Sequence, residues 1–224
     1  MTEEQRLYRQ TVRDNQLKHE LLEREVNEKR TVIEVHPDYI VPDTNTFIHH
    51  LDAFQKIAES EKFKIAVPVI VLSELRKLSL LIPMKSGIEL FDDESPEDWV
   101  GKRAKVAIAY LEKVKDKRIF CTVTSQGNRI SPLFSAPEEL SSGDEMKKND
   151  ESIQSNNDDL VLLSCCKLSA RLPTPLSRIS DDHIHPRIYR SVVLLTDDRA
   201  LNIKAVLKNI PCRTVTSFVK WAFS

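Results

Sequence analysis

The alternation of short apolar runs with longer helical stretches is the feature that most restricts how this chain can fold. Four runs read as strands, namely "YIVPD" (39–43), "KIAV" (64–67), "FCTV" (120–123) and "SVVLLTDD" (191–198). Segments of helical composition occupy residues 46–60, 68–81, 158–172 and 199–209, and the last segment, 212–223, ends the chain. Continuous apolar strands that alternate with helices indicate a parallel sheet covered on both faces. We therefore predict an α/β fold.

The length of the chain favours one main domain. With 224 residues, 41% of them apolar, it can bury one sizeable core. We place this domain at residues 37–224, after a charged helix or arm over residues 1–36, which contain no Gly or Pro. From this N-terminal segment we expect the sequence to be the C-terminal part of a longer protein. Three polar stretches, 83–99, 124–156 and 173–186, are predicted to be mobile loops.

Charge and cysteine usage exclude several classes of protein. Lys and Arg (33) balance Asp and Glu (34), so no polybasic tail for nucleic acid or membrane is present. The four cysteines are scattered in apolar contexts, and no apolar run reaches the roughly 18 residues that span a bilayer. We expect a reduced, intracellular, soluble and monomeric domain without a membrane partner.

Carboxylates gather where a parallel sheet binds its ligands. Asp43, Asp197 and Asp198 end predicted strands, while Asp158 and Asp159 open a predicted helix. Ligands of open parallel sheets bind beyond the carboxyl ends of the strands, where the strand order reverses. Glu74 lies inside an otherwise apolar helix, where an unpaired carboxylate would be costly. These acids are therefore candidates for one site.

Each acid also has a plainer explanation. An Asp after a strand or at a helix start is often a turn or cap residue, and Glu74 could lie on a helix surface beside Arg76. Clustered carboxylates, however, repel unless a cation joins them. Oxygen ligands without Cys or His select Mg²⁺ or Mn²⁺, which can activate water for attack on a phosphodiester.

Other chemistries lack their motifs. The adjacent Cys165 and Cys166, even with His183 and His185, do not have the C-x-x-C spacing of a zinc site. No G-x-S-x-G elbow, P-loop or G-x-G-x-x-G occurs, and the chain has only four glycines. A serine hydrolase and a dinucleotide-binding enzyme are therefore disfavoured.

Four motifs carry a resemblance to a known family. "VPDTNTFIHHL", "VPVIVLSELRKL", "NNDDLVLLSCC" and "VVLLTDDRALNIKA" follow one another in order over roughly residues 39–224. Together they resemble a PIN nuclease domain, most closely that of the telomerase-binding Est1-like SMG endonucleases of nonsense-mediated mRNA decay. The resemblance implies an α/β/α sandwich with a twisted parallel sheet and an acidic, metal-dependent ribonuclease site.

The resemblance also assigns roles to residues. It implies that Asp43, Glu74, Asp158 and Asp198 are the catalytic acids and hold one or two Mg²⁺ or Mn²⁺ ions. Supporting roles fall to Asn45, Asp159, Thr196 and Asp197, with Asp159 as either a cap or a neighbour of the site. Relatives carry an acid where this chain has His49, and another where it has Arg76, which changes the charge at the rim of the site.

The resulting hypothesis is an endoribonuclease that cleaves single-stranded RNA in nonsense-mediated mRNA decay, in the cytoplasm and also in the nucleus. Water is the nucleophile, so the products should carry 5′-phosphate and 3′-hydroxyl ends. Other regions or decay-factor proteins would select the mRNA, since the near-zero net charge predicts weak RNA binding. The alternative is a catalytically silent PIN-like scaffold that binds RNA or decay-factor proteins. A metal titration would distinguish the two.

Overall fold

The computed structural model describes residues 13, 32–80, 96–134, 156–172 and 187–224. Contacts divide the chain into two compact units, residues 1–34 with 174–189 and residues 35–173 with 190–224. Of the first unit the structure describes Arg13, which is helical, and the first residues of two strands. The second unit contains the rest of the described fold.

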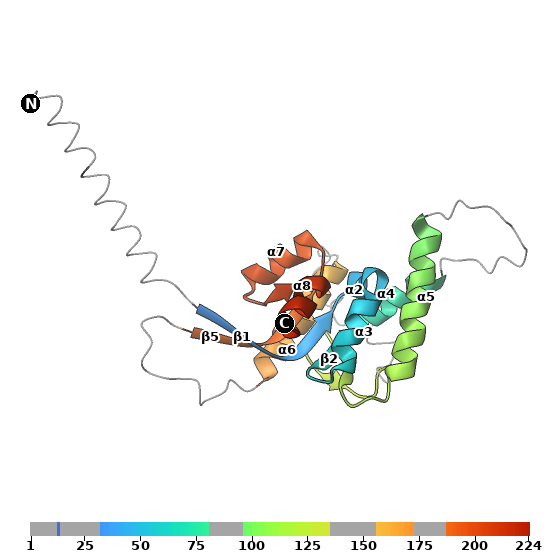
Figure 1. The fold of residues 1–224 in the computed structure, drawn as a ribbon, viewed down its shortest axis with the longest axis horizontal. Coiled ribbons are helices and arrows are strands. Elements are labelled where there is room, and N and C mark those ends of the chain that lie inside the picture. The colour runs from blue at the N-terminus through green and yellow to red at the C-terminus, as the bar shows by residue number, and fades with distance from the viewer. Residues whose placement is uncertain (1–12, 14–31, 81–95, 135–155, 173–186) are drawn as a thin grey trace, which may run out of the picture. The chain divides into compact units, whose positions relative to one another are not determined.

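One sheet of six strands runs through the described residues in the order β4-β3-β2-β1-β5-β6. Figure 1 labels its central strands, β2, β1 and β5. The strands are β1 (Val32–Pro42), β2 (Lys64–Pro68), β3 (Phe120–Val123), β4 (Arg129–Ile130), β5 (Arg187–Leu195) and β6 (Cys212–Arg213). The pairs β1–β2, β2–β3 and β5–β6 are parallel, and β3–β4 is antiparallel. The chain adds strands on one side of β1 and then returns to its other side with β5. The strand order therefore reverses between β1 and β5.

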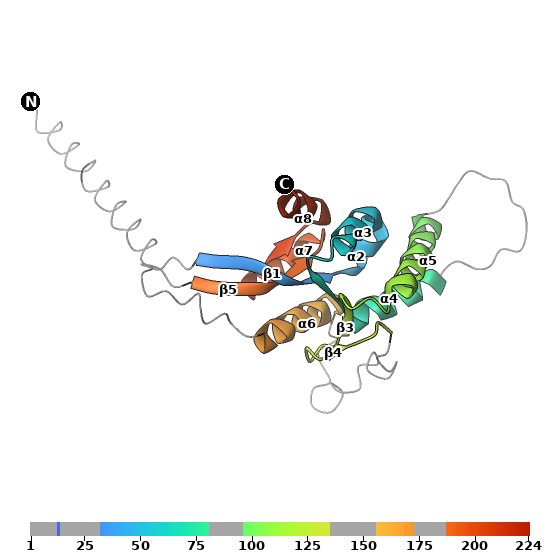
Figure 2. The same ribbon diagram turned by 60° about the horizontal axis from the view of Figure 1, so that its bottom comes forward.

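Helices cover the sheet on both faces. They are α2 (Thr44–His49), α3 (Leu51–Glu59), α4 (Val69–Leu80), α5 (Pro96–Val114), α6 (Asn157–Arg171), α7 (Arg199–Leu207) and α8 (Val215–Ala222). Figure 2 shows α3 and α8 on one side of β1 and β5, with α6 on the other. Apolar strand residues such as Ile40, Val67 and Leu194 are fully buried between these layers. The predicted α/β fold with a mostly parallel, helix-covered sheet is confirmed.

Two predicted boundaries were wrong. The helix or arm drawn to residue 36 is β strand from Val32 onward, because the segment "VIEV" supplies the β-branched residues that strands favour. The single helix predicted over residues 46–60 is two helices that meet at His50, whose backbone (φ −130°, ψ 27°) is not helical.

Helix α5 was absent from the predicted elements, and the predicted loop 83–99 contains its first residues, from Pro96 on. Its buried apolar residues are Ala104, Ala107, Leu111 and Val114, which recur at helical spacing within a strongly charged segment. The charged residues between them obscured this apolar stripe. The helix packs against α4 and α2, so it forms one wall beside the edge where β1 ends.

The predicted loop 124–156 also contains regular structure. Residues Arg129–Ile130 form β4, which pairs antiparallel with β3. The stretches 81–95, 135–155 and 173–186, and most of the predicted N-terminal helix, lie outside the described residues, so their mobility stays a prediction. In the described part of the chain, no helix has the length and apolarity required to cross a membrane.

Candidate active site

An acidic pocket of about 260 Å³ lies where β1 ends, at the point of strand-order reversal. Four carboxylates line it, and each comes from a different segment: Asp43 after β1, Glu74 in α4, Asp158 in α6 and Asp198 before α7. Asn45 lines it as well. The structure thus brings together acids that are far apart in sequence.

Asp43 is buried and rigidly held. Only 4% of it is exposed, and its backbone N–H donates to the Leu195 carbonyl at 3.1 Å, which fixes the end of β1 beside the end of β5. The backbone N–H and the hydroxyl of Thr46 donate to Oδ1 at 2.7 and 2.8 Å, and the Thr196 hydroxyl donates to Oδ2 at 2.5 Å. Burial raises the pKa of this carboxyl, although these hydrogen bonds act in the opposite direction.

Asp198 caps α7. Its Oδ1 accepts the backbone N–H groups of Ala200 and Leu201 at 2.6 and 3.1 Å. Its own N–H donates to the Thr196 hydroxyl at 3.0 Å, and that hydroxyl in turn donates to Asp43. Thr196 therefore links the strand-end acid to the start of α7.

Glu74 and Asp158 complete the acidic lining from two other helices. The Thr44 hydroxyl donates to Oε2 of Glu74 at 2.5 Å, which ties α4 to the start of α2. The pKa of Asp158 is raised, first by burial, then by the negative charge of Asp198, with Asp159 and Glu74 adding to the effect and Lys204 opposing it. The carboxylates are therefore close enough to repel one another.

Asp159 and Asp197 are not among the residues that line the pocket. Asp159 accepts a hydrogen bond from Nζ of Lys204, on α7, at 2.7 Å. Asp197 pairs with Nε2 of His50 at the junction of α2 and α3. Neither Asp158 nor Asp159 is the N-cap of α6, because that position belongs to Asn156.

Sequence comparison identifies the family. A model of the PIN domain family matches residues 40–216, most of the chain. The chain belongs to the PIN domain family. It is also 33% identical over 192 residues to the telomerase-binding protein EST1A of Danio rerio. That alignment covers 85% of this chain and 12% of the relative, so the chain spans about an eighth of the length of that protein. The family predicted from the four motifs is confirmed.

Two solved structures are similar to this PIN domain. The PIN domain of human SMG5 has 18% sequence identity and a TM-score of 0.39, with 82% of this chain and 97% of that chain covered. The RRP44 PIN domain of T. brucei has 14% identity and a TM-score of 0.40, with 83% and 81% covered.

The donor set of this PIN domain fits a hard divalent cation. The carboxylates supply oxygen ligands. Burial is the first cause of the raised pKa at Asp43 and at Asp158, and neighbouring carboxylates add to it, so a cation would favour the ionised forms of both groups. Within the described residues, no three His, Cys, Asp or Glu side chains are grouped closely enough to ligate one ion together. Mg²⁺ tolerates this arrangement, since it keeps several waters and takes only one or two carboxylates.

Sequence reasoning named Thr196 but missed three other residues that contact the acids, namely Thr44, Thr46 and His50. Thr46 follows Asp43 by three residues, which is the spacing at which a helix-capping Asp accepts a backbone N–H. That pattern could have identified Thr46. Thr44 and His50 reach Glu74 and Asp197 only through tertiary contacts, so no local signal pointed to them.

Proposed function

We propose that this PIN domain is a divalent-metal-dependent endoribonuclease that cleaves single-stranded RNA. The observation that supports the proposal most strongly is the convergence of Asp43, Glu74, Asp158 and Asp198 on one pocket at the carboxyl edge of the sheet. Carboxylates this close together repel one another, so their placement in one pocket supports a function that uses their negative charge.

One or two of these carboxylates would hold the ion from fixed positions. Asp43 is oriented by three hydrogen bonds, so its carboxylate needs no rearrangement to act as a ligand. Among the described residues, Oδ2 of Asp198 and Oε1 of Glu74 remain for a ligand, because the cap and the Thr44 hydroxyl engage the other oxygens. Bound Mg²⁺ or Mn²⁺ would activate water for in-line attack and neutralise the departing oxygen.

The lining of the pocket favours internal cleavage. The described residues that line it include four carboxylates and no Lys or Arg. Such a pocket offers no cationic side chain to recognise a terminal phosphate, which an enzyme that starts at a 5′-phosphate would need. A single strand can bend one phosphate into this site, whereas a rigid duplex would be hindered. Hydrolysis by water leaves 5′-phosphate and 3′-hydroxyl ends.

The cellular context is a further part of the proposal. The relative is named for telomerase binding, and it is far longer than this chain. We place the domain in nonsense-mediated mRNA decay, in the cytoplasm and also in the nucleus, with mRNA as substrate and decay-factor proteins as partners. The small net charge of −1 supports substrate selection by other regions or partners.

Circular single-stranded RNA tests the activity. With Mn²⁺ the protein should cut the circle, leave a duplex of the same sequence largely uncut and lose activity in EDTA. Asp43→Asn should abolish the cleavage, and Lys167→Gln, a change at an exposed residue of α6, should not. If the circle survives while linear RNA is trimmed from one end, the protein is an exonuclease and the endonuclease assignment is wrong. No cleavage with any divalent ion would favour the silent scaffold.

A further inference from the structure

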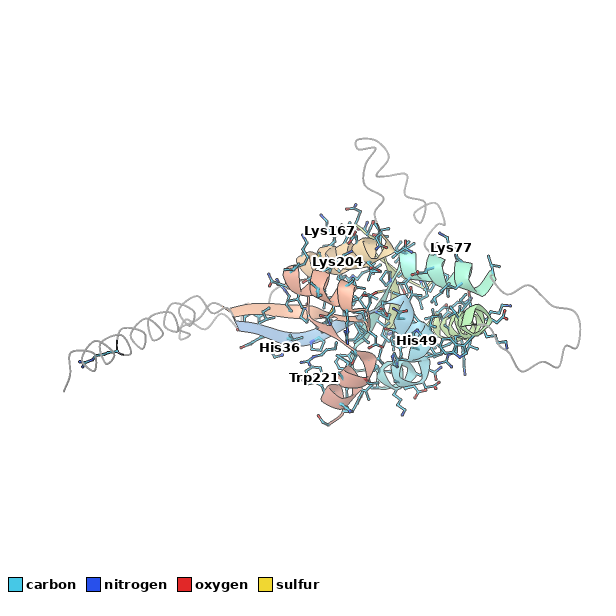
Figure 3. The ribbon with its side chains drawn as sticks, turned by 90° about the horizontal axis from the view of Figure 1, so that it is seen from above. His36, His49, Lys77, Lys167, Lys204 and Trp221 are labelled. Carbon is cyan, nitrogen blue, oxygen red and sulfur yellow. The ribbon has the colours of Figure 1, made fainter. Side chains whose placement is uncertain are left out.

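An exposed tryptophan stands at the rim of the acidic pocket. Trp99, on α5, is 38% exposed, and the next residue, Val100, lines the pocket. His49, at the end of α2, also lines it and is exposed (Figure 3). The indole and imidazole ring centroids are 5.3 Å apart, with 32° between the planes. Two aromatic rings therefore form a tilted pair beside the carboxylates.

An arginine fixes this pair in place. Arg103 follows Trp99 by one helical turn, and its guanidinium carbon lies 5.8 Å from the centre of the indole ring. Its Nε also donates to the backbone carbonyl of Ile48 at 2.9 Å. Ile48 lines the pocket, so this hydrogen bond ties α5 to the wall of the site. The position of Trp99 relative to the acids is thereby held by a polar link.

We propose that Trp99, flanked by His49 and supported by Arg103, is a stacking platform for a base of single-stranded RNA next to the phosphate in the acidic pocket. An indole ring stacks with any nucleobase, and a nearby guanidinium adds favourable charge. The platform supplies attraction where the carboxylates alone would repel RNA. Duplex RNA cannot use it, since its bases are already stacked. The inference rests on the proposed function and names how that site would hold its substrate.

Tryptophan fluorescence tests the contact directly. The chain contains two tryptophans, so Trp221→Phe leaves Trp99 as the sole one. In that protein, with Asp158→Asn added to prevent cleavage, single-stranded RNA with Mn²⁺ should quench the emission. An oligomer of the same length whose residues are abasic, and a duplex, should quench it far less. Equal quenching by the abasic oligomer, or none by intact RNA, would overturn the platform.

Substitutions separate stacking from packing. Trp99→Phe keeps an aromatic ring, while Trp99→Leu keeps apolar volume without one. By anisotropy of labelled RNA, Trp99→Leu should bind at least about fivefold more weakly, the lower limit of base–aromatic stacking, and Trp99→Phe should stay near the parent protein. Trp221→Leu, at a 49% exposed tryptophan on α8 that does not line the pocket, is the matched control and should bind as the parent does. Melting temperatures establish that each variant is folded.

The outcomes distinguish the platform from the nuclease. Quenching and Trp99-dependent binding without cleavage by the otherwise unaltered protein would support the platform and refute the enzyme. Cleavage of circular RNA with an unchanged KM in folded Trp99→Leu would support the enzyme and refute the platform. Equal affinity of folded Trp99→Leu and Trp99→Phe would also refute it.

Discussion

At the scale of the single residue, Asp43 and Asp198 are helix N-caps and pocket acids at once. Asp43 accepts one backbone N–H of α2, Asp198 accepts two of α7, and both residues line the acidic pocket. The cap fixes the direction of the carboxylate, and the second oxygen of Asp198 accepts neither of the cap bonds. The structural and functional explanations of these residues are therefore compatible. Asn is an equally good cap, so Asp→Asn changes charge while it preserves the cap.

The raised pKa of Asp43 predicts how stability depends on pH. A carboxyl that binds its proton more tightly when folded adds stability below its unfolded pKa, about 3.9, and loses that contribution as pH rises through the folded pKa. In EDTA, Asp43→Asn should therefore melt higher than the parent protein at pH 7. The difference between the two melting temperatures should become smaller as the pH falls towards 4. A gap that is constant across thermal melts from pH 4 to 8 would contradict the effect of burial.

The neighbours Asp158 and Asp159 should differ in activity. Asp158 lines the pocket, whereas Asp159 is half exposed and pairs with Lys204. Asp158→Asn should lower kcat on single-stranded RNA about a thousandfold, which corresponds to several kcal/mol of transition-state stabilisation. Asp159→Asn should lower kcat only about tenfold, as expected for a residue beside the site. Equal losses in initial-rate assays would show that Asp159 is also needed at the ion.

At the scale of the element, the turn between β3 and β4 depends on one glycine. Gly127 has φ +77°, and a Cβ placed there would lie 2.7 Å from the carbonyl carbon of Lys167 and 2.8 Å from the nitrogen of Leu168. These are backbone atoms of α6, the helix that carries Asp158. The turn therefore packs directly on that helix, and only a residue without a side chain fits.

Gly127→Ala should destabilise the domain by about 2 kcal/mol or more, because strain at positive φ adds to the clash with α6. Urea unfolding monitored by circular dichroism measures the loss. Gln126→Ala, at the exposed preceding residue, is the control and should change stability by less than about 0.5 kcal/mol. An unchanged unfolding midpoint in Gly127→Ala would mean that the turn can move away from α6 without cost.

At the scale of the whole molecule, the pocket joins segments from both ends of the described fold. Its acids follow β1, lie in α4 and α6, and precede α7, so they meet only in the folded domain. An ion that binds there binds the folded state and not the unfolded chain. Metal binding and folding should therefore be coupled by mass action.

Mn²⁺ should raise the melting temperature of the protein. At ten times its dissociation constant, an ion stabilises the folded state by about 1.4 kcal/mol, or roughly 3–6 °C for a domain of this size. Differential scanning calorimetry with Mn²⁺, and with NaCl at equal ionic strength as control, measures the shift. The melting temperature of Asp43→Asn should rise less with Mn²⁺ than that of the parent protein. Equal rises in melting temperature for the two proteins would show that the ion binds away from Asp43.

The sequence determined the four longer strands and the acids at the ends of two of them, because both depend on local properties. Continuous apolar runs can be stable only between two covering layers, and an Asp at a strand end or helix start is fixed by backbone hydrogen bonding. Helix α5 was not predicted, because charged residues separate its buried apolar residues along the sequence. Asp43, Glu74, Asp158 and Asp198 could therefore be named as candidate site residues from the sequence alone.

Tertiary structure alone decided which side chains share the pocket. Asp158 and Asp159 are adjacent on a helix, where one residue corresponds to a turn of about 100°. The packing of α6 beside α7 directs one carboxylate into the pocket and the other to Lys204. The same holds for Trp99, which reaches the rim because α5 packs against α2 and Arg103 holds it to Ile48. These contacts join residues far apart in the chain, so no local pattern could specify them.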